Sequence, residues 1–158
     1  MIRAIAAIDD RRGIGRHGDI PWNIPDDTAY YRRHTEHSPI IMGRATYDGF
    51  KQPLVNRRNL VMSNSLKEVR QGFELLPDAA TFLTTATEDV WIIGGAGPYQ
   101  ALLEYCDELY LTHVDGDYDC DRFFPAYAEQ FELVSESPLN EQNGHHFRYA
   151  IYRRLKNR

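Results

Sequence analysis

Short, continuously apolar runs separated by glycine-containing turns and polar helical stretches restrict the fold of this chain more than any other feature. Runs such as 40–42 (IIM) and 90–93 (VWII) are apolar at every position, which is typical of strands covered on both faces. Residues 147–152 (FRYAIY) instead alternate, as an edge or antiparallel strand does. The sequence therefore predicts strands at 2–8, 39–42, 59–62, 90–93, 108–115, 131–136 and 147–153.

Helices are expected between these strands, at 26–36, 45–50, 78–86 and 98–106. Asp26 and Asp78 are residues that cap helix starts, and Pro98 suits a first helical position after Gly97. Strands and helices alternate until about residue 115, and strands close the chain. This order predicts an α/β fold with a single, mostly parallel twisted sheet, an antiparallel C-terminal strand and helices on both faces.

The length and charge of the chain limit its number of domains and the kinds of partner it can bind. With 158 residues we expect one domain over 1–158. The formal net charge of −5 argues against a nucleic-acid partner, and no apolar run is long enough to span a membrane. The two cysteines, Cys106 and Cys120, form no framework of disulfides and are expected to be buried thiols. We expect a cytoplasmic protein, and a monomer, because no surface stripe is evident.

Ligands of such sheets bind at the carboxyl ends of the strands, and two glycine turns follow strands there. The first is Gly94-Gly95-Ala96-Gly97 and the second is Gly43-Arg44-Ala45-Thr46. Glycines allow close backbone approach, and a helix N-terminus offers N–H groups to a phosphate. Two such turns suit a dinucleotide. The alternative is that the glycines only make tight turns and that Arg44 is a solvated surface residue.

Residues 9–20 hold three glycines and many charges, so we expect a mobile loop that acts as a lid or, alternatively, an ordinary exposed connection. The next segment, 21–25, is stiffened by two prolines. Asp27 then lies in the first helical turn and shares a face with Tyr31. An acid among aromatic residues is costly to bury without a partner, and a donor-rich ligand is one possible partner. The alternative is that Asp27 only favours the helix dipole.

Together these pieces resemble the dihydrofolate reductase family over nearly the whole chain. The resemblance rests on seven motifs in the family's order: Ile14-Gly15, Pro21-Trp22-Asn23-Ile24-Pro25-x-Asp27, Met42-Gly43-Arg44-x-Thr46-Tyr47, Pro53-Leu54-x-x-Arg57, Ile93-Gly94-Gly95-x-x-x-Tyr99, Leu109-Tyr110-Leu111-Thr112-His113 and Asp121-x-x-Phe124-Pro125. It implies reduction of 7,8-dihydrofolate to tetrahydrofolate with NADPH, and sensitivity to antifolate inhibitors.

The resemblance also implies roles for matching residues. Asp27 would bind the pterin ring, Thr112 would support that carboxylate, and Arg57 would clamp a substrate carboxylate. Asp27, Tyr99 and Thr112 are the expected catalytic residues. The expected substrate-binding residues are Ile5, Ala6, Ala7, Asp27, Thr28, Tyr31, Phe50, Leu54, Arg57, Ile93 and Thr112.

NADPH is the implied cofactor, because Arg44 suits a 2′-phosphate. The glycine pair Gly94-Gly95, typically joined by a cis peptide in the family, would lie beneath it, with Tyr99 near the nicotinamide. The expected cofactor-binding residues are Ala7, Ile14, Gly15, Ile20, Gly43, Arg44, Ala45, Thr46, Ser63, Asn64, Ile93, Gly94, Gly95, Ala96, Gly97 and Tyr99.

Several positions depart from the family's pattern. Ala45 and Gly97-Pro98 lack the polar or basic side chains often found there, Thr28 replaces an apolar residue, and Cys120 replaces a glycine. Ile20 at the lid tip is a conservative change. Asp26 places a second negative charge beside Asp27, which would raise the pKa of Asp27.

Other functions have weaker support. His145-His146 lacks the further ligands that a metal site needs, and His113 should face away from Thr112. No nucleophile elbow is present for a hydrolase. The related pyrimidine reductase of riboflavin synthesis lacks the pterin-binding Asp pattern, and a non-catalytic nucleotide- or antifolate-binding protein would not need the complete set of site residues.

Overall fold

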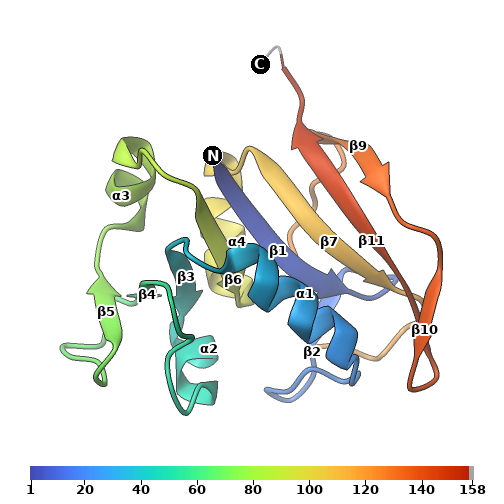
Figure 1. Cartoon of the computed structure of the whole chain (residues 1–158), viewed down its shortest axis with the longest axis horizontal. Helices are drawn as coiled ribbons and strands as arrows, with labels where there is room; N and C mark the ends of the chain where they lie inside the picture. Colours follow the sequence, from blue (N-terminus) through green and yellow to red (C-terminus); the bar gives the residue numbers. More distant parts are fainter. Residues whose placement is uncertain (157–158) are drawn as a thin grey trace.

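The computed structural model describes residues 1–156 and is built on one mixed β-sheet (Figure 1). Its strands run in the order β10-β11-β7-β1-β6-β3-β4-β5, with β9 also paired to β11. The elements are β1 (Ile2–Ile8), β2 (Gly13–Gly15), α1 (Pro25–Thr35), β3 (Ile40–Gly43), α2 (Arg44–Gly49), β4 (Asn59–Met62), β5 (Phe73–Leu76), α3 (Ala79–Thr85), β6 (Val90–Gly94), α4 (Ala96–Leu102), the 3-10 helix η1 (Leu103–Tyr105), β7 (Glu108–Val114), β8 (Arg122–Phe123), β9 (Phe131–Glu136), β10 (Asn140–Gln142) and β11 (His145–Arg154).

The predicted fold class is confirmed. The strands from β7 to β5 pair in parallel, whereas β11 pairs antiparallel with β7, β9 and β10. All seven predicted strands are present, with small shifts at their ends. The structure adds β5 at one edge and β10 beside β11, which the sequence analysis did not predict.

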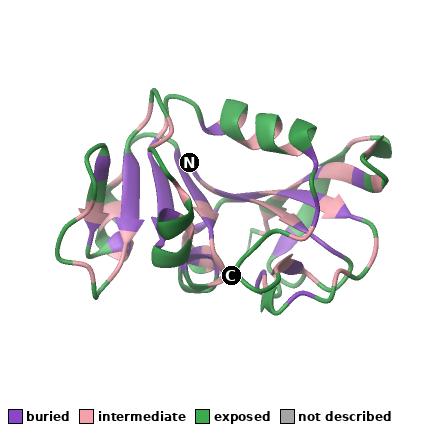
Figure 2. Ribbon diagram, turned by 90° about the horizontal axis from the view of Figure 1, so that it is seen from below, coloured by how far each residue is buried: buried purple, intermediate pink, exposed green. Residues whose placement is uncertain are grey.

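The two faces of the sheet carry separate apolar clusters. On one face Tyr99 and Leu102 of α4 and Leu83 of α3 pack against β1, β6 and β7. On the other face Ile5 packs with Tyr31 of α1 and other aromatic residues. Figure 2 shows α1 lying across this second face, with its outer surface exposed and the strands beneath it buried. Helices therefore cover both faces, as predicted.

Two helix starts differ from the prediction. The N-cap of α1 is Ile24, not Asp26, because Pro25 takes the first helical position, where its missing N–H leaves nothing unbonded. Helix α4 begins at Ala96 rather than Pro98, and Pro98 lies within the first turn, where an N–H would have no partner inside the helix. The prediction for α3 is confirmed, since Asp78 accepts a hydrogen bond from Thr81 N.

Residues 9–20 are more ordered than a loop, because β2 pairs with β8 in a small second sheet. Buried Asp9 anchors this sheet: Oδ1 accepts from Gly13 N at 2.7 Å and Oδ2 accepts from Tyr118 N at 3.0 Å. Burial would raise the pKa of Asp9, but its hydrogen bonds outweigh burial and hold the pKa below its ordinary value, the donors being Tyr118, Gly13, Arg11 and Cys120. Asp9 thus joins the segment that carries the predicted lid to the loop around Tyr118.

Gly13→Ala should destabilise the protein by about 1–3 kcal/mol, because overpacking forces its neighbours to move. A Cβ there would lie 2.5 Å from Cys120 Cβ and 2.8 Å from Asp9 Oδ1. Adding Cys120→Gly should restore part of this loss in a double-mutant cycle measured by urea unfolding. Gly49→Ala is the control, since a Cβ there has no neighbour within 4 Å. Equal stability of Gly13→Ala and wild type would contradict the packing described here.

Candidate active site

The carboxyl ends of β1, β3, β4 and β6 meet at one edge of the sheet, because these strands are mutually parallel. The residues that follow them are Asp9, Arg44, Ser63 and Gly95. The fold therefore places both predicted glycine turns, the Ser63-Asn64 turn and the start of the predicted lid on the same side of the molecule.

Asp27 is the chemically distinctive residue of this region. Thr112 Oγ1 of β7 donates a hydrogen bond of 2.6 Å to Asp27 Oδ1 from α1. Thr112 is buried, and Asp27 lies beneath the helix. Burial raises the pKa of Asp27, and the Thr112 hydrogen bond offsets only part of this effect. The cause is burial and not the neighbouring Asp26, so the expectation that Asp26 raises this pKa is wrong.

An apolar cluster lies beneath α1, the helix that carries Asp27. Ile5 is buried in it, and four other predicted substrate-binding residues pack against it: Tyr31, Phe50, Leu54 and Ile93. Ala7 packs against the neighbouring cluster around Trp22. The side chain of Ala6 instead joins the cluster on the opposite face of the sheet. Alternation along β1 therefore leaves only the backbone of Ala6 on the side of Ile5.

Arg57 is held rigidly beside the far end of α1. Its Nη1 donates to Arg32 O and to Thr35 Oγ1, each at 2.8 Å, and its Nε donates to Val55 O at 2.8 Å. These bonds fix the plane of the guanidinium and use its Nε–H and both Nη1–H groups. The two N–H groups of Nη2 remain to bind a carboxylate.

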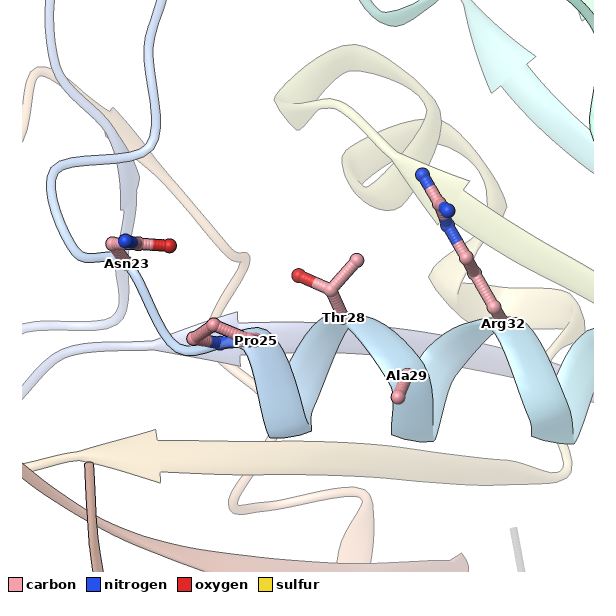
Figure 3. Close-up of a pocket in the computed structure, with 5 residues that line it drawn as sticks. All are labelled: Asn23, Pro25, Thr28, Ala29 and Arg32. Carbon is pink, nitrogen blue, oxygen red and sulfur yellow. The ribbon is translucent and has the colours of Figure 1, made fainter. Parts of the chain in front are cut away.

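The outer side of α1 carries a cavity of about 560 Å³. It is lined by Asn23, Pro25, Thr28, Ala29 and Arg32. Figure 3 shows Thr28 and Arg32 extending from the same side of α1, with Asn23 in the segment before the helix. Thr28 is exposed, so its hydroxyl is accessible to a ligand or to water.

The Gly94-Gly95 turn packs closely against Thr46 and Tyr99. Its peptide bond is cis, as the resemblance implies, and Gly94 has a φ of 133°. A Cβ on Gly94 would lie 3.3 Å from Thr46 Oγ1 and 3.5 Å from Tyr99 Oη. Tyr99 itself is buried and donates a hydrogen bond of 2.6 Å to Ile5 O, and its burial raises its pKa. Tyr99 thus joins the glycine turn to the apolar cluster around Ile5.

Polar groups surround this turn at the expected cofactor positions. Arg44 is exposed and forms an ion pair with Asp48 at 3.2 Å. Ser63 Oγ accepts hydrogen bonds from Ser65 N and Leu66 N, which orders the turn that carries Asn64. Gly43 is buried against Pro98, so it serves packing more than contact with a ligand. Ala45 and Gly97 are exposed, and Ala96 is partly buried.

The predicted lid residues lie in different surroundings. Ile14 packs against the main apolar cluster, whereas Ile20 is 65% exposed. Gly15 O accepts a hydrogen bond from Asp121 N at 2.8 Å. The base of this segment is thus fixed, and its tip is exposed.

The sequence analysis did not predict three residues of the C-terminal segment that contact α1 or the residues just before it: Gln142, Asn143 and Tyr149. Asp26 N donates to Gln142 Oε1 and Asn143 Nδ2 donates to Asn23 O, both at 2.9 Å. The rings of Tyr30 and Tyr149 stack with centroids 4.0 Å apart. No local signal predicts these contacts, because they join residues more than 100 positions apart.

The remaining candidates have structural partners. His113 Nε2 lies 2.7 Å from Tyr152 Oη, and His145 Nδ1 lies 2.6 Å from Tyr118 Oη. Cys106 and Cys120 are buried free thiols, as predicted. Within residues 1–156 no group of three or more His, Cys, Asp or Glu side chains is placed to bind a metal ion. In the same range, none of the helices has the length and apolar character needed to cross a membrane.

Comparison with known proteins agrees with this geometry. The family model described as dihydrofolate reductase matches residues 1–154. Curated relatives include dihydrofolate reductase of Bacillus subtilis (strain 168), 34% identical over 96% of this chain and 94% of the relative. Dihydrofolate reductase of Drosophila melanogaster is 36% identical over 93% and 94%. Dihydrofolate reductase type 3 of Salmonella typhimurium is 38% identical over 92% and 93%.

A solved structure shows the same architecture. Dihydrofolate reductase from Enterococcus faecalis, complexed with NADP(H) and RAB-propyl, superimposes with a TM-score of 0.88 at 28% identity. The match covers 98% of this chain and 96% of that one. The sequence motifs, the fold and these relatives all lead to one conclusion, that the chain belongs to the dihydrofolate reductase family.

Proposed function

We propose that this NADPH-dependent dihydrofolate reductase binds the pterin ring of 7,8-dihydrofolate at Asp27 and reduces its C6=N5 bond to give tetrahydrofolate. The reaction consumes NADPH and one proton and releases NADP⁺. The observation that carries this assignment is the Asp27 carboxylate, partly buried on the helix that covers an apolar cluster, with the Thr112 hydroxyl as its hydrogen-bond partner. A buried carboxylate needs more hydrogen-bond donors than one hydroxyl supplies. The amino and ring N–H groups of a pterin supply them.

Asp27 and Thr112 act on the pterin electrostatically. Hydride reaches C6 most easily when N5 is protonated, and the Asp27 carboxylate favours the positively charged ring. Asp27 binds the far side of the ring from N5, so water delivers the proton and Asp27 orients the ring. Ile5, Tyr31, Phe50, Leu54 and Ile93 exclude bulk water around it.

The other end of the substrate binds outside the pterin pocket. Arg57 clamps the α-carboxylate of the glutamate, because its guanidinium plane is fixed by hydrogen bonds to Arg32, Thr35 and Val55. Ala6, Ala7 and Thr28 complete the substrate contacts, Ala6 through its backbone. Antifolate inhibitors with a similar ring compete for Asp27 and this pocket.

The residues around Gly94-Gly95 fit NADPH, since open space lies beside Gly97 and the hydroxyl of Thr46 lies beside Gly94 and Gly95. When bound, NADPH supplies the hydride. Arg44, Thr46, Ser63 and Asn64 hold its phosphates, and Tyr99 fixes the turn beneath the nicotinamide. The remaining contacts come from Ala7, Ile14, Gly15, Ile20, Gly43, Ala45, Ile93, Ala96 and Gly97. Residues 9–20 serve as the lid.

Charge and composition support the remaining parts of the proposal. The enzyme works as one domain over residues 1–158, as a cytoplasmic monomer without nucleic-acid or membrane partners. Its net charge of −5 disfavours binding to anionic polymers. Its cysteines are free thiols, in keeping with a reducing compartment.

Asp27→Asn should leave NADPH binding unchanged and lower turnover at pH 7 by at least about a hundredfold, because a neutral amide does not favour the protonated pterin. The loss should shrink as pH falls, since more substrate then arrives already protonated. The measurement is absorbance at 340 nm with NADPH and dihydrofolate. Asp26→Asn is the matched control, since Asp26 is exposed in the same helical turn. Near wild-type turnover of Asp27→Asn at pH 7 would contradict the assigned role.

Arg44→Gln should raise the Kd for NADPH about 10- to 100-fold, which corresponds to loss of a charged hydrogen bond. The Kd for NADH should not change, because NADH lacks the 2′-phosphate. Fluorescence titration with each nucleotide measures both values. Arg58→Gln is the control, an exposed arginine that forms an ion pair with Glu74 at 2.8 Å. Equal weakening for both nucleotides would remove Arg44 from the phosphate site.

A further inference from the structure

The first turn of α1 has an N–H group that its own segment does not cap. The N-cap residue is Ile24, whose side chain makes no capping hydrogen bond. Pro25 has no N–H, and Asp27 N bonds to Ile24 O at 3.0 Å. Asp26 N is therefore the donor of this turn that needs a partner from elsewhere.

That partner comes from the C-terminal hairpin. Gln142, the last residue of β10, accepts the hydrogen bond from Asp26 N through Oε1 at 2.9 Å. The next residue, Asn143, donates from Nδ2 to Asn23 O at 2.9 Å. Figure 1 shows the end of this hairpin beside the start of α1. Two consecutive side chains thus hold the chain on both sides of the helix start.

Helix α1 has other fixed points near Asp27. Only Thr35, at the opposite end, is buried among its residues Pro25–Thr35. Near its start, the contacts to the sheet are the Asp27–Thr112 hydrogen bond, the Tyr30–Tyr149 stack and the buried side chain of the N-cap residue Ile24, which shares a cluster with residues of β7 and β11. Tyr149 is the register partner of Thr112 across β7 and β11. The strand that leads out of the hairpin therefore also supports the environment of Asp27.

We propose that Gln142 is a positioning residue for dihydrofolate reduction, which acts by capping α1 at Asp26 N and so orienting the Asp27 carboxylate toward the pterin. This inference rests on the proposed role of Asp27. Gln142 is placed to affect the substrate more than the cofactor, because the residues proposed to hold the cofactor phosphates follow β3 and β4, beyond β7 and β1 in the sheet.

The effect of a charge placed at position 142 can be measured through the pH dependence of the reaction. The aromatic hydroxyls are neutral in the working range, and burial raises the pKa values of Tyr30 and Tyr149 to about 12. A new carboxylate at position 142 would therefore act on Asp27 without a competing titration from these rings. The titratable and charged groups around Asp27 and the tyrosine rings beside it are Asp26, Tyr30, Tyr31, Arg33 and His34 on α1, Tyr99 on α4, Tyr110 on β7 and Tyr149 on β11. His145 on β11 is the register partner of Gln142.

The test compares Gln142→Ala with Gln142→Glu. Loss of the cap should raise KM for dihydrofolate and the Kd for folate about fivefold in Gln142→Ala, as expected for loss of an N-cap. Gln142→Glu keeps an acceptor for Asp26 N and should restore both values. Its added negative charge should also move the alkaline limb of the pH–rate profile to higher pH, because it favours the protonated pterin. In both variants the Kd for NADPH should stay at the wild-type value. The thermal midpoint should fall in Gln142→Ala and recover in Gln142→Glu, because loss of an N-cap also destabilises the fold.

Asn140→Ala is the matched control on the same strand, since the Asn140 side chain bonds only to the nearby Pro138 O. It should leave every value unchanged. The proposal fails if Gln142→Ala keeps wild-type KM and folate affinity, if Asn140→Ala matches it, or if NADPH affinity falls equally. A failure of the proposed function is distinguishable, because it would appear as wild-type turnover in Asp27→Asn whatever Gln142 does.

Discussion

The hydrogen bond between Thr112 Oγ1 and Asp27 Oδ1 joins the central sheet to the helix that covers it, and the site depends on it. Partial burial raises the pKa of the carboxylate, so the protein carries a group that is less well solvated when ionised than a surface carboxylate. In the complex that we propose, the N–H donors of the pterin relieve this cost and contribute to the free energy of substrate binding.

The sheet topology separates the two partners of the reaction. The folate side that we propose lies beneath α1, with Asp27 and Arg57 toward opposite ends of that helix. The cofactor side that we propose lies along the turns after β3, β4 and β6. Tyr99 connects the two sides, because it packs under the glycine turn and donates to Ile5 O. Antiparallel β11 adds the hairpin that holds the start of α1.

The sequence was sufficient to predict the elements whose pattern is local. Continuous apolar runs such as VWII predicted the buried parallel strands, and family motifs predicted Asp27, Thr112 and Arg57 as site residues. Short edge strands were missed, because β5 and β10 have three or four residues and little periodicity. The cap of α1 was misplaced on Asp26, since Gln142, 116 residues away, supplies the acceptor and no sequence spacing indicates that pairing.

The pH dependence of stability without ligand tests most directly whether Asp27 is buried at a cost. Because folding raises its pKa above the ordinary 3.8, Asp27 stabilises the fold least when ionised. Asp27→Asn should therefore be more stable than wild type at pH 7. Each kcal/mol of added stability should raise Tm by about 2–4 °C. This advantage should shrink as pH falls through the raised pKa of Asp27, because the wild-type carboxyl then takes up a proton. A variant that is equally or less stable at pH 7, with no pH-dependent difference, would contradict the account.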